Sequence, residues 1–338
     1  MSTTLVQQAS QNLTDVLRDV FEHNENTMSL VIYDLNSPLA ILLTDAYRMA
    51  LTNGVFINFH DANKDDIMSQ MEALESGDFV ALIQSSSFRL SAFRIRIELF
   101  KKSIKVVEHP HLDRMRTDHE VKTYVSTLAY DKEYYHHNGH TLKSILKTAK
   151  GAVIHCGDEK LIYPGPFEDA KLNIGDYREM KNIGGQFPIG EVFTELKELT
   201  SLNGKTKVMA FGDINYNVNI PKCSITIVIE NGQLVRTENT TPEFEAVLDM
   251  IREEEGVIWV RELGLGLNRA LSKENFVSDM GTFERMCGLH LSLGAKHGIY
   301  GKEGFGRNSG RFHIDVMIDT DSLEIDDTVV FDGEKWVV

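Results

Sequence analysis

Histidine and carboxylate side chains recur within apolar, strand-like segments toward the end of the chain. In RFHIDVMID, residues 311–319, apolar and polar side chains alternate, and this period of two predicts a β-strand. Because successive side chains of a strand point to opposite faces, His313 and Asp315 share one face. A single strand therefore offers an imidazole and a carboxylate, two groups that bind divalent metals, to the same site.

Two earlier segments each add one metal-binding side chain to a similar pattern. In RELGLGLN, residues 261–268, the leucines lie on one face, and Glu262 shares the other face with Gly264 and Gly266. Glycine weakens a strand, and inside one it often marks the close approach of a ligand or of another backbone. In GLHLSLG, His290 likewise faces away from the leucines. Both segments therefore present a potential ligand on the face without leucines.

A fourth segment, GQFPIGEVFTEL, supplies a further carboxylate at the point where a turn would lead into a strand. Together the segments contribute three carboxylates and two imidazoles: Glu191, Glu262, His290, His313 and Asp315. Such a set exceeds the needs of one ion and suits two divalent cations, such as zinc, cobalt or manganese, that share a bridging carboxylate. These residues therefore predict a two-metal hydrolase.

In their order and approximate separation, GEVFTE, ELGLGLN, GLHLSLG and the final HID resemble the metallopeptidase family of aminopeptidase T and aminopeptidase S, over roughly residues 140–338. The resemblance implies a leucyl aminopeptidase-like activity that removes N-terminal residues from peptides or peptide-like small substrates. It places the family's metal ligands on the same five residues. It also implies a homodimer.

The catalytic groups are less well defined than the metal ligands. A carboxylate must accept a proton from the attacking water, and Glu191 and Glu262 are both candidates. The family also has a tyrosine shortly after the histidine of its third motif. Here that stretch reads AKHGIYGK, so Tyr300 is assigned to this role although His297 lies nearer the usual position. This departure from the family pattern leaves the identity of the substrate open.

Two other functions fit parts of the same pattern. Ring-cleaving non-haem iron dioxygenases that act on dihydroxypyridines resemble these peptidases. They imply an iron held by two histidines and one carboxylate, with a histidine at the position of Glu262. A non-enzymatic relative could instead keep the fold as a peptide-binding protein. Because all five ligand types are retained, the hydrolase is favoured over both.

Composition narrows the class of protein and its partners. Hydrophobic residues make up 42% of the 338 residues and charged residues 25%, as in ordinary globular proteins. The formal net charge of −15 argues against nucleic-acid binding, which depends on clustered lysine and arginine. No apolar run approaches the ~18 residues of a membrane span. The three cysteines are widely spaced, which indicates a reducing compartment. We therefore expect a cytoplasmic protein that binds neither nucleic acid nor membrane.

The arrangement of predicted elements changes along the chain. Strands alternate with helices through the first part, which predicts βαβ units around a parallel sheet. The stretch DKEYYHHNGHT, residues 131–141, changes composition and is expected to begin a linker or crossover. Beyond it, many short β segments and hairpin signals such as Asn231-Gly232 predict a mostly antiparallel unit. We therefore predict an N-terminal α/β domain of residues 1–138 and a C-terminal α+β domain of residues 139–338 that carries the metal site.

Overall fold

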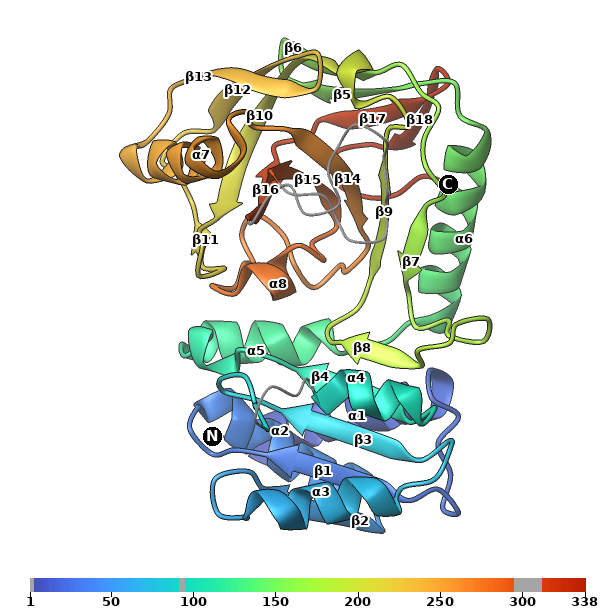
Figure 1. Cartoon of the computed structure of the whole chain (residues 1–338). Helices are drawn as coiled ribbons and strands as arrows, with labels where there is room; N and C mark the ends of the chain where they lie inside the picture. The colour runs from blue at the N-terminus through green and yellow to red at the C-terminus, as the bar shows by residue number, and fades with distance from the viewer. Residues whose placement is uncertain (1–2, 91–94, 295–311) are drawn as a thin grey trace. The chain divides into compact units, whose positions relative to one another are not determined.

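The computed structural model describes residues 3–90, 95–294 and 312–338, and the chain divides into two compact units (Figure 1). The first unit comprises Met1–Tyr135, Gly175–Ile189 and Asn275–Asp279, and the second comprises His136–Ile174, Gly190–Glu274 and Met280–Val338. Two later segments of the chain thus return to the first unit. The sequence predicted a single boundary after residue 138, which does not account for the two segments Gly175–Ile189 and Asn275–Asp279 of the first unit.

The first unit is built around a sheet in which every strand is parallel to its neighbours, in the order β2-β1-β3-β4-β8. Its strands are β1 (Ser29–Tyr33), β2 (Gly54–Asn58), β3 (Phe79–Ile83), β4 (Lys105–His109) and β8 (Gly184–Gln186). Its helices are α1 (Thr3–Asp19), α2 (Pro38–Ala50), α3 (Lys64–Ala73), α4 (Ile95–Lys101) and α5 (Asp118–Thr127), with a 3₁₀ turn, η1 (Leu112–Arg114). Strands β1 and β3 bury every residue, as expected where helices cover both faces of a parallel sheet. The predicted α/β architecture is confirmed.

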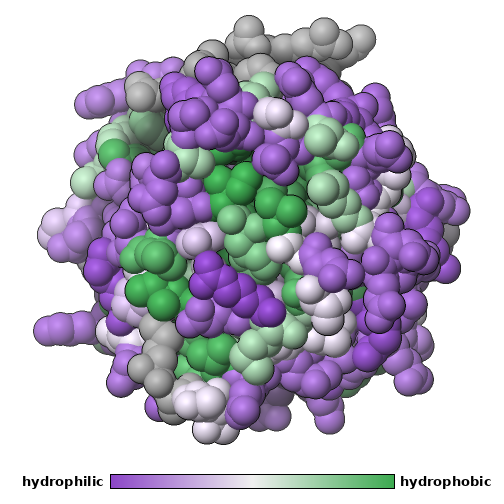
Figure 2. Space-filling view, turned by 90° about the horizontal axis from the view of Figure 1, so that it is seen from below, coloured by the Kyte–Doolittle hydropathy of each residue, from purple (hydrophilic) through white to green (hydrophobic). Residues whose placement is uncertain are grey.

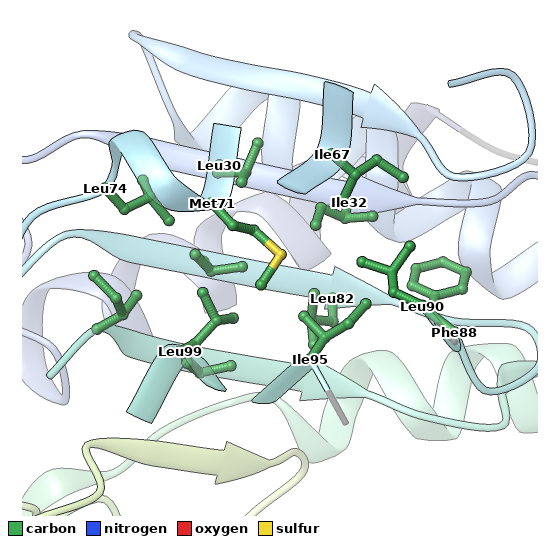
Figure 3. Close-up of a cluster of buried hydrophobic side chains, with 13 residues drawn as sticks. Leu30, Ile32, Ile67, Met71, Leu74, Leu82, Phe88, Leu90, Ile95 and Leu99 are labelled. Carbon is green, nitrogen blue, oxygen red and sulfur yellow. The ribbon is translucent and has the colours of Figure 1, made fainter. Parts of the chain in front are cut away.

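Helices α3 and α4 pack on the same face of this sheet. Figure 3 shows Ile67 and Met71 of α3, together with Ile95 and Leu99 of α4, reaching toward Leu82 of β3 and its neighbours. All five side chains are almost completely buried. Burial of apolar side chains from two helices against one sheet face supplies the main favourable free energy for docking such helices.

A buried histidine connects β4 to two helices of the first unit. Nε2 of His109 lies 3.0 Å from the Tyr47 hydroxyl, and Nδ1 lies 2.9 Å from the Tyr124 hydroxyl. Tyr124 donates its one proton to the Phe187 carbonyl at 3.0 Å, so it accepts from Nδ1–H, and Nε2 accepts from Tyr47. This arrangement requires a neutral imidazole, and burial lowers the pKa of His109 to about 3.

Hydrophobic residues also reach the surface of the molecule. Figure 2, the view from below, shows green hydrophobic patches set among purple hydrophilic residues. In the first unit, Ile41 and Met49 of α2 are exposed and line a shallow hollow of about 430 Å³ with residues of α1. Among the residues that line this hollow, Asp45 alone is charged, so the hollow does not carry a catalytic set of side chains.

The second unit contains one large sheet, in which all strand pairs are antiparallel. Among the described residues, thirteen strands join it, in the order β18-β17-β5-β6-β10-β16-β15-β14-β9-β7, with β11 and β12 paired to β10 and β13 paired to β12. The strands are β5 (Ala152–Cys156), β6 (Glu159–Tyr163), β7 (Lys171–Asn173), β9 (Glu191–Glu195), β10 (Asn203–Gly212), β11 (Val218–Asn219), β12 (Ile225–Glu230), β13 (Gln233–Glu238), β14 (Val260–Gly266), β15 (Gly288–Gly294), β16 (His313–Ile318), β17 (Ser322–Ile325) and β18 (Thr328–Phe331). The helices are α6 (Lys132–Thr148), α7 (Pro242–Glu255) and α8 (Met280–Phe283), with a 3₁₀ turn, η2 (Leu199–Ser201). The predicted antiparallel α+β character is confirmed.

The turn between β12 and β13 has the conformation that its sequence requires. Asn231 has a φ of 51° and Gly232 a φ of 76°, so both lie in the left-handed region. A two-residue hairpin turn of type I′ needs this conformation at both positions, and asparagine followed by glycine adopts it at low cost. The hairpin predicted here from the sequence is confirmed, with Glu230 paired to Gln233.

Residues 131–141, expected to begin a linker or crossover, contain the boundary between the two units after Tyr135, and most of them form the first part of α6. Tyr135, Leu142 and Leu146 recur at helical spacing and are buried. Histidines between these apolar residues interrupt the pattern, so the composition of the segment did not indicate a helix. Within residues 3–90, 95–294 and 312–338, no helix is both long and apolar enough to cross a membrane.

Replacing His109 by glutamine should make the free energy of unfolding less dependent on pH. The unfolded chain takes up a proton on this residue near pH 6.5, whereas the folded chain does so only near pH 3. Between these values the wild type therefore loses about 1.4 kcal/mol of stability per pH unit of acidification from this group alone. Urea unfolding at pH 7 and pH 5 measures the difference, with His119→Gln at an exposed position as the control. An equal pH dependence in His109→Gln and wild type would contradict this assignment.

Candidate metal centre

The five predicted ligands lie on four neighbouring strands of the second unit, in the order β16-β15-β14-β9. In the registers of these strands, Glu191 is opposite Gly266, and His290 is opposite Gly264. Cross-strand partners lie on the same face of a sheet, so the ligands gather on one face. As the alternation predicts, His313 and Asp315 also share a face, with Nε2 of the histidine 3.1 Å from Oδ1 of the aspartate.

A β-bulge interrupts the pairing of β14 with β15 at Glu262. Arg261 and Glu262 of β14 together oppose Ser292 of β15, because the register shifts between Val260 and Leu263. The backbone N–H of Glu262 donates to Oγ of Ser292 at 3.1 Å, which ties the bulge to the neighbouring strand. Bulges are common beside active sites. In its unbroken pairing with β9, Glu262 keeps the alternation that places it on the same face as Gly264 and Gly266.

Gly264 leaves the space that the His290 imidazole occupies. A Cβ on Gly264 would overlap the ring at Nε2 and Cε1. Gly266 has an equivalent role, since a Cβ there would overlap the carbonyl oxygen of Met286. The glycines that the sequence places beside Glu262 thus allow a side chain and a backbone to approach the strand closely.

The predicted ligands form two groups that share Glu262. In the inner subsite, composed of Glu191, Glu262 and His290, Nε2 of the histidine lies 3.2 Å from Oε1 of Glu191 and 3.5 Å from Oε1 of Glu262. The outer subsite is composed of Glu262, His313 and Asp315. Within each group, one ligand atom from each residue lies within 4.8 Å of the other two. Because metal–ligand distances are about 2.0–2.6 Å, one cation could contact all three residues of a group.

Several polar atoms of these groups are buried without a hydrogen-bond partner among the residues that the structure describes. They are Nδ1 of His290 and Oε2 of Glu262, whereas Nε2 of His290 and Oδ1 of Asp315 face only other potential ligands. Buried polar atoms are normally paired, and an exception calls for an explanation such as a bound ion. Imidazole nitrogens and carboxylate oxygens are donors that zinc, cobalt and manganese accept. The residues therefore fit a pair of divalent cations.

Burial and charge oppose each other in setting the proton affinities of these groups. Burial alone would lower the pKa of His290, but the carboxylates of Glu191 and Glu262 raise it well above its ordinary value. Burial alone would raise the pKa of Asp315, but His313 and His290 lower it to about 2. A cation in the inner subsite would therefore compete with a proton for His290.

Two further residues, just before β15, join the site and were not predicted from the sequence. Glu284 supplies a ligand atom within 4.8 Å of those of His290 and Asp315. Burial raises the pKa of Glu284 well above its usual value, although the charge of Arg285 opposes the shift. Nη1 of Arg285 lies 2.6 Å from Oε2 of Glu191 and 2.7 Å from Oε1 of Glu284. Neither Glu284 nor Arg285 lies in a strand, so no alternating pattern marks them.

The two carboxylates considered as proton acceptors have different surroundings. Burial would raise the pKa of Glu191, but Arg285 and His290 lower it. This makes Glu191 a weak base. Glu262 instead keeps Oε2 without a hydrogen-bond partner among the described residues. The other catalytic candidates, Tyr300 and His297, lie outside the described residues.

Comparison with known proteins identifies relatives of the fold. No protein-family model matches the chain, and no curated protein matches it. The solved structure of 2,5-dihydroxypyridine dioxygenase from Pseudomonas putida KT2440 is similar, with a TM-score of 0.63 and 17% identity over 100% of this chain and 98% of that chain. The structure of AmpT from Thermus thermophilus is similar with a TM-score of 0.59 and 13% identity, over 98% of this chain and 99% of that chain. At these identities the likeness shows a shared fold alone.

Replacing Gly264 by alanine should weaken metal binding by displacing His290. The new Cβ overlaps the imidazole, so the ring or the strand must move, and overpacking of this kind typically costs ~1–3 kcal/mol of stability. We expect a lower melting temperature and a lower metal content per chain, measured by plasma mass spectrometry. The control is Gly212→Ala in β10, where the new Cβ would lie 3.3 Å from the flexible side chain of Met280. Full metal content in Gly264→Ala would show that the imidazole does not depend on this space.

Proposed function

We propose that the chain is a metal-dependent aminopeptidase that hydrolyses the first amide bond of a peptide or a peptide-like small substrate. The observation that carries this proposal is the membership of Glu262 in both ligand groups. A carboxylate shared between two three-residue groups is what a two-metal hydrolytic site requires of its bridging ligand. The motifs that resemble the aminopeptidase T family, and the fold similarity to AmpT, support the same function.

The residues of the inner and outer subsites would hold two divalent ions, zinc, cobalt or manganese. Such ions would supply an acidified water and polarise the scissile carbonyl. Arg285 keeps Glu191 ionised by donating to it, so Glu191 serves as a ligand and not as a base. Oε2 of Glu262 and the carboxyl of Glu284, whose pKa burial raises, are then the groups of this site suited to take the proton of the water.

The acidic groups of the site suit cations rather than a single charged side chain. Four carboxylates lie together, Glu191, Glu262, Glu284 and Asp315, and Arg285 contacts two of them. These carboxylates would offset the positive charge of two divalent ions.

The dioxygenase remains the second candidate, because its solved relative has the same fold over nearly its whole length. An iron site of the expected kind needs two histidines and one carboxylate. None of the ligand groups among the described residues contains both His290 and His313, and Glu262 stands where that family implies a histidine. These features favour the hydrolase. A homodimer in the cytoplasm remains part of the proposal.

Metal content and peptidase activity test the proposed function. Protein purified without chelators should contain about two zinc, cobalt or manganese ions per chain by plasma mass spectrometry and should hydrolyse aminoacyl anilides. One iron per chain with no anilide hydrolysis would favour the dioxygenase. No metal after reconstitution would mean that the ligands do not form a binding site.

Removing the shared carboxylate should abolish the activity without unfolding the protein. Glu262→Gln keeps the size of the side chain but removes its charge, so we expect kcat/KM to fall by about 10²-fold or more, with an unchanged circular dichroism spectrum. Asp319→Asn is the matched control, because Asp319 follows β16, bonds Ser224 and Lys273, and belongs to none of the described ligand groups. Full turnover in Glu262→Gln would remove this residue from the mechanism.

A further inference from the structure

We infer that Arg285 makes the two metal subsites unequal, so that a first cation occupies the outer subsite and a second enters the inner subsite with lower affinity. The inference rests on the proposed two-metal function and assigns to this arginine the role of a positioning residue. It acts as a fixed positive charge beside the inner subsite, and it controls the second cation through Glu191.

The contacts of Arg285 are specific to the inner side of the site. Its Nη1 lies 2.6 Å from Oε2 of Glu191 and occupies that oxygen. The other oxygen of Glu191, Oε1, lies 3.2 Å from Nε2 of His290 and remains available to a cation. The same nitrogen lies 2.7 Å from Oε1 of Glu284. The guanidinium thus contacts one ligand of the inner subsite and the carboxylate next to it.

The outer subsite does not share these contacts. Among the described residues, the ion pairs of Arg285 are with Glu191 and Glu284, and none is with a residue of the outer subsite. The charges of Glu191 and Glu284 also act on Arg285 more strongly than those of Asp315 and Glu262. A cation in the inner subsite would therefore lie nearer to a fixed like charge than a cation in the outer subsite. His313 is also partly exposed, with 26% of its side-chain surface accessible, whereas His290 is completely buried.

Backbone pairing, burial and two ion pairs hold Arg285 in place. The N–H of Asn268 donates to the carbonyl of Arg285 at 2.8 Å, and Asn268 also forms a β-bridge with Met286. Only 8% of the Arg285 side-chain surface is accessible. A buried arginine with two carboxylate partners loses both ion pairs if it leaves, which makes the departure costly. Its charge is therefore a permanent part of the site.

Titration with Co²⁺ alone, followed by visible absorption and calorimetry, tests this inference in the full-length chain. Wild type should bind two ions in separate steps, and Arg285→Lys, which keeps the charge, should also show two separate steps. Arg285→Met removes the charge, so the second ion should bind at least about 10-fold more tightly and the two steps should converge. An unchanged or weaker second step in Arg285→Met, or two equal steps in wild type, would overturn the inference.

A purely structural role for Arg285 predicts a different result. It would lower the melting temperature of Arg285→Met and leave the Co²⁺ affinities unchanged. Arg114→Met is the matched control, because Arg114 forms a 2.7 Å ion pair with the buried Asp279 of the first unit. This control should lose stability and keep the wild-type Co²⁺ titration.

The order of binding can be measured without altering Arg285, which covers the case that Arg285→Met does not fold. His313→Asn should abolish the tight step, whereas Glu191→Gln should keep it and lose the weak one. The opposite pattern would overturn the inference. Two unequal Co²⁺ steps in a chain that hydrolyses no peptide would contradict the proposed function while leaving the role of Arg285 intact. Binding of fewer than two ions by wild type would contradict both.

Discussion

The packing of the His290 imidazole on the bare backbone of Gly264 is the contact on which the rest of the candidate site depends. Neighbouring strands of a sheet lie only about 4.8 Å apart, so a ring can lie over the next strand only where that strand has no Cβ. This contact brings Nε2 of His290 near both Glu191 and Glu262. Glu262, on the same face of β14 as Gly264, also lies close to His313 and Asp315. One glycine thus permits the two ligand groups to meet at a shared carboxylate.

The second requirement of the site is compensation of buried charge. Carboxylates of Glu191, Glu262 and Asp315 are each at most 6% exposed, and burying an ion without a partner is costly. The ion pairs of Arg285 with Glu191 and Glu284 offset part of this cost. The remaining unpaired oxygens would be satisfied by cations. Folding stability and metal binding are therefore expected to be coupled in this protein.

The sequence predicts the parts of this protein that follow a simple period. Alternation placed Glu262, His290, His313 and Asp315 on strands, and a turn signal placed Glu191 at the start of another. The regular succession of helices and strands predicted the parallel sheet of the first unit. Glu284 and Arg285 were not predicted, because a turn has no period and Arg285 acts through contact with Glu191, more than ninety positions earlier. The helix at residues 132–148 was harder to predict, because its histidines and glycine have low helix propensity. Burial of Tyr135, Leu142 and Leu146 outweighs this unfavourable propensity in the folded chain.

The position of β8 in the first unit has a consequence for how the chain is made. This strand, Gly184–Gln186, forms the edge of the parallel sheet beside β4, yet it is synthesised some seventy residues later, after β5, β6 and β7 of the second unit. Until the ribosome has passed residue 186, the edge of β4 lacks its neighbour and presents unpaired backbone groups. Co-translational folding of the first unit is therefore incomplete while the first segment of the second unit, which contains β5 to β7, is already emerging. A fragment ending at residue 138 would keep that exposed edge permanently.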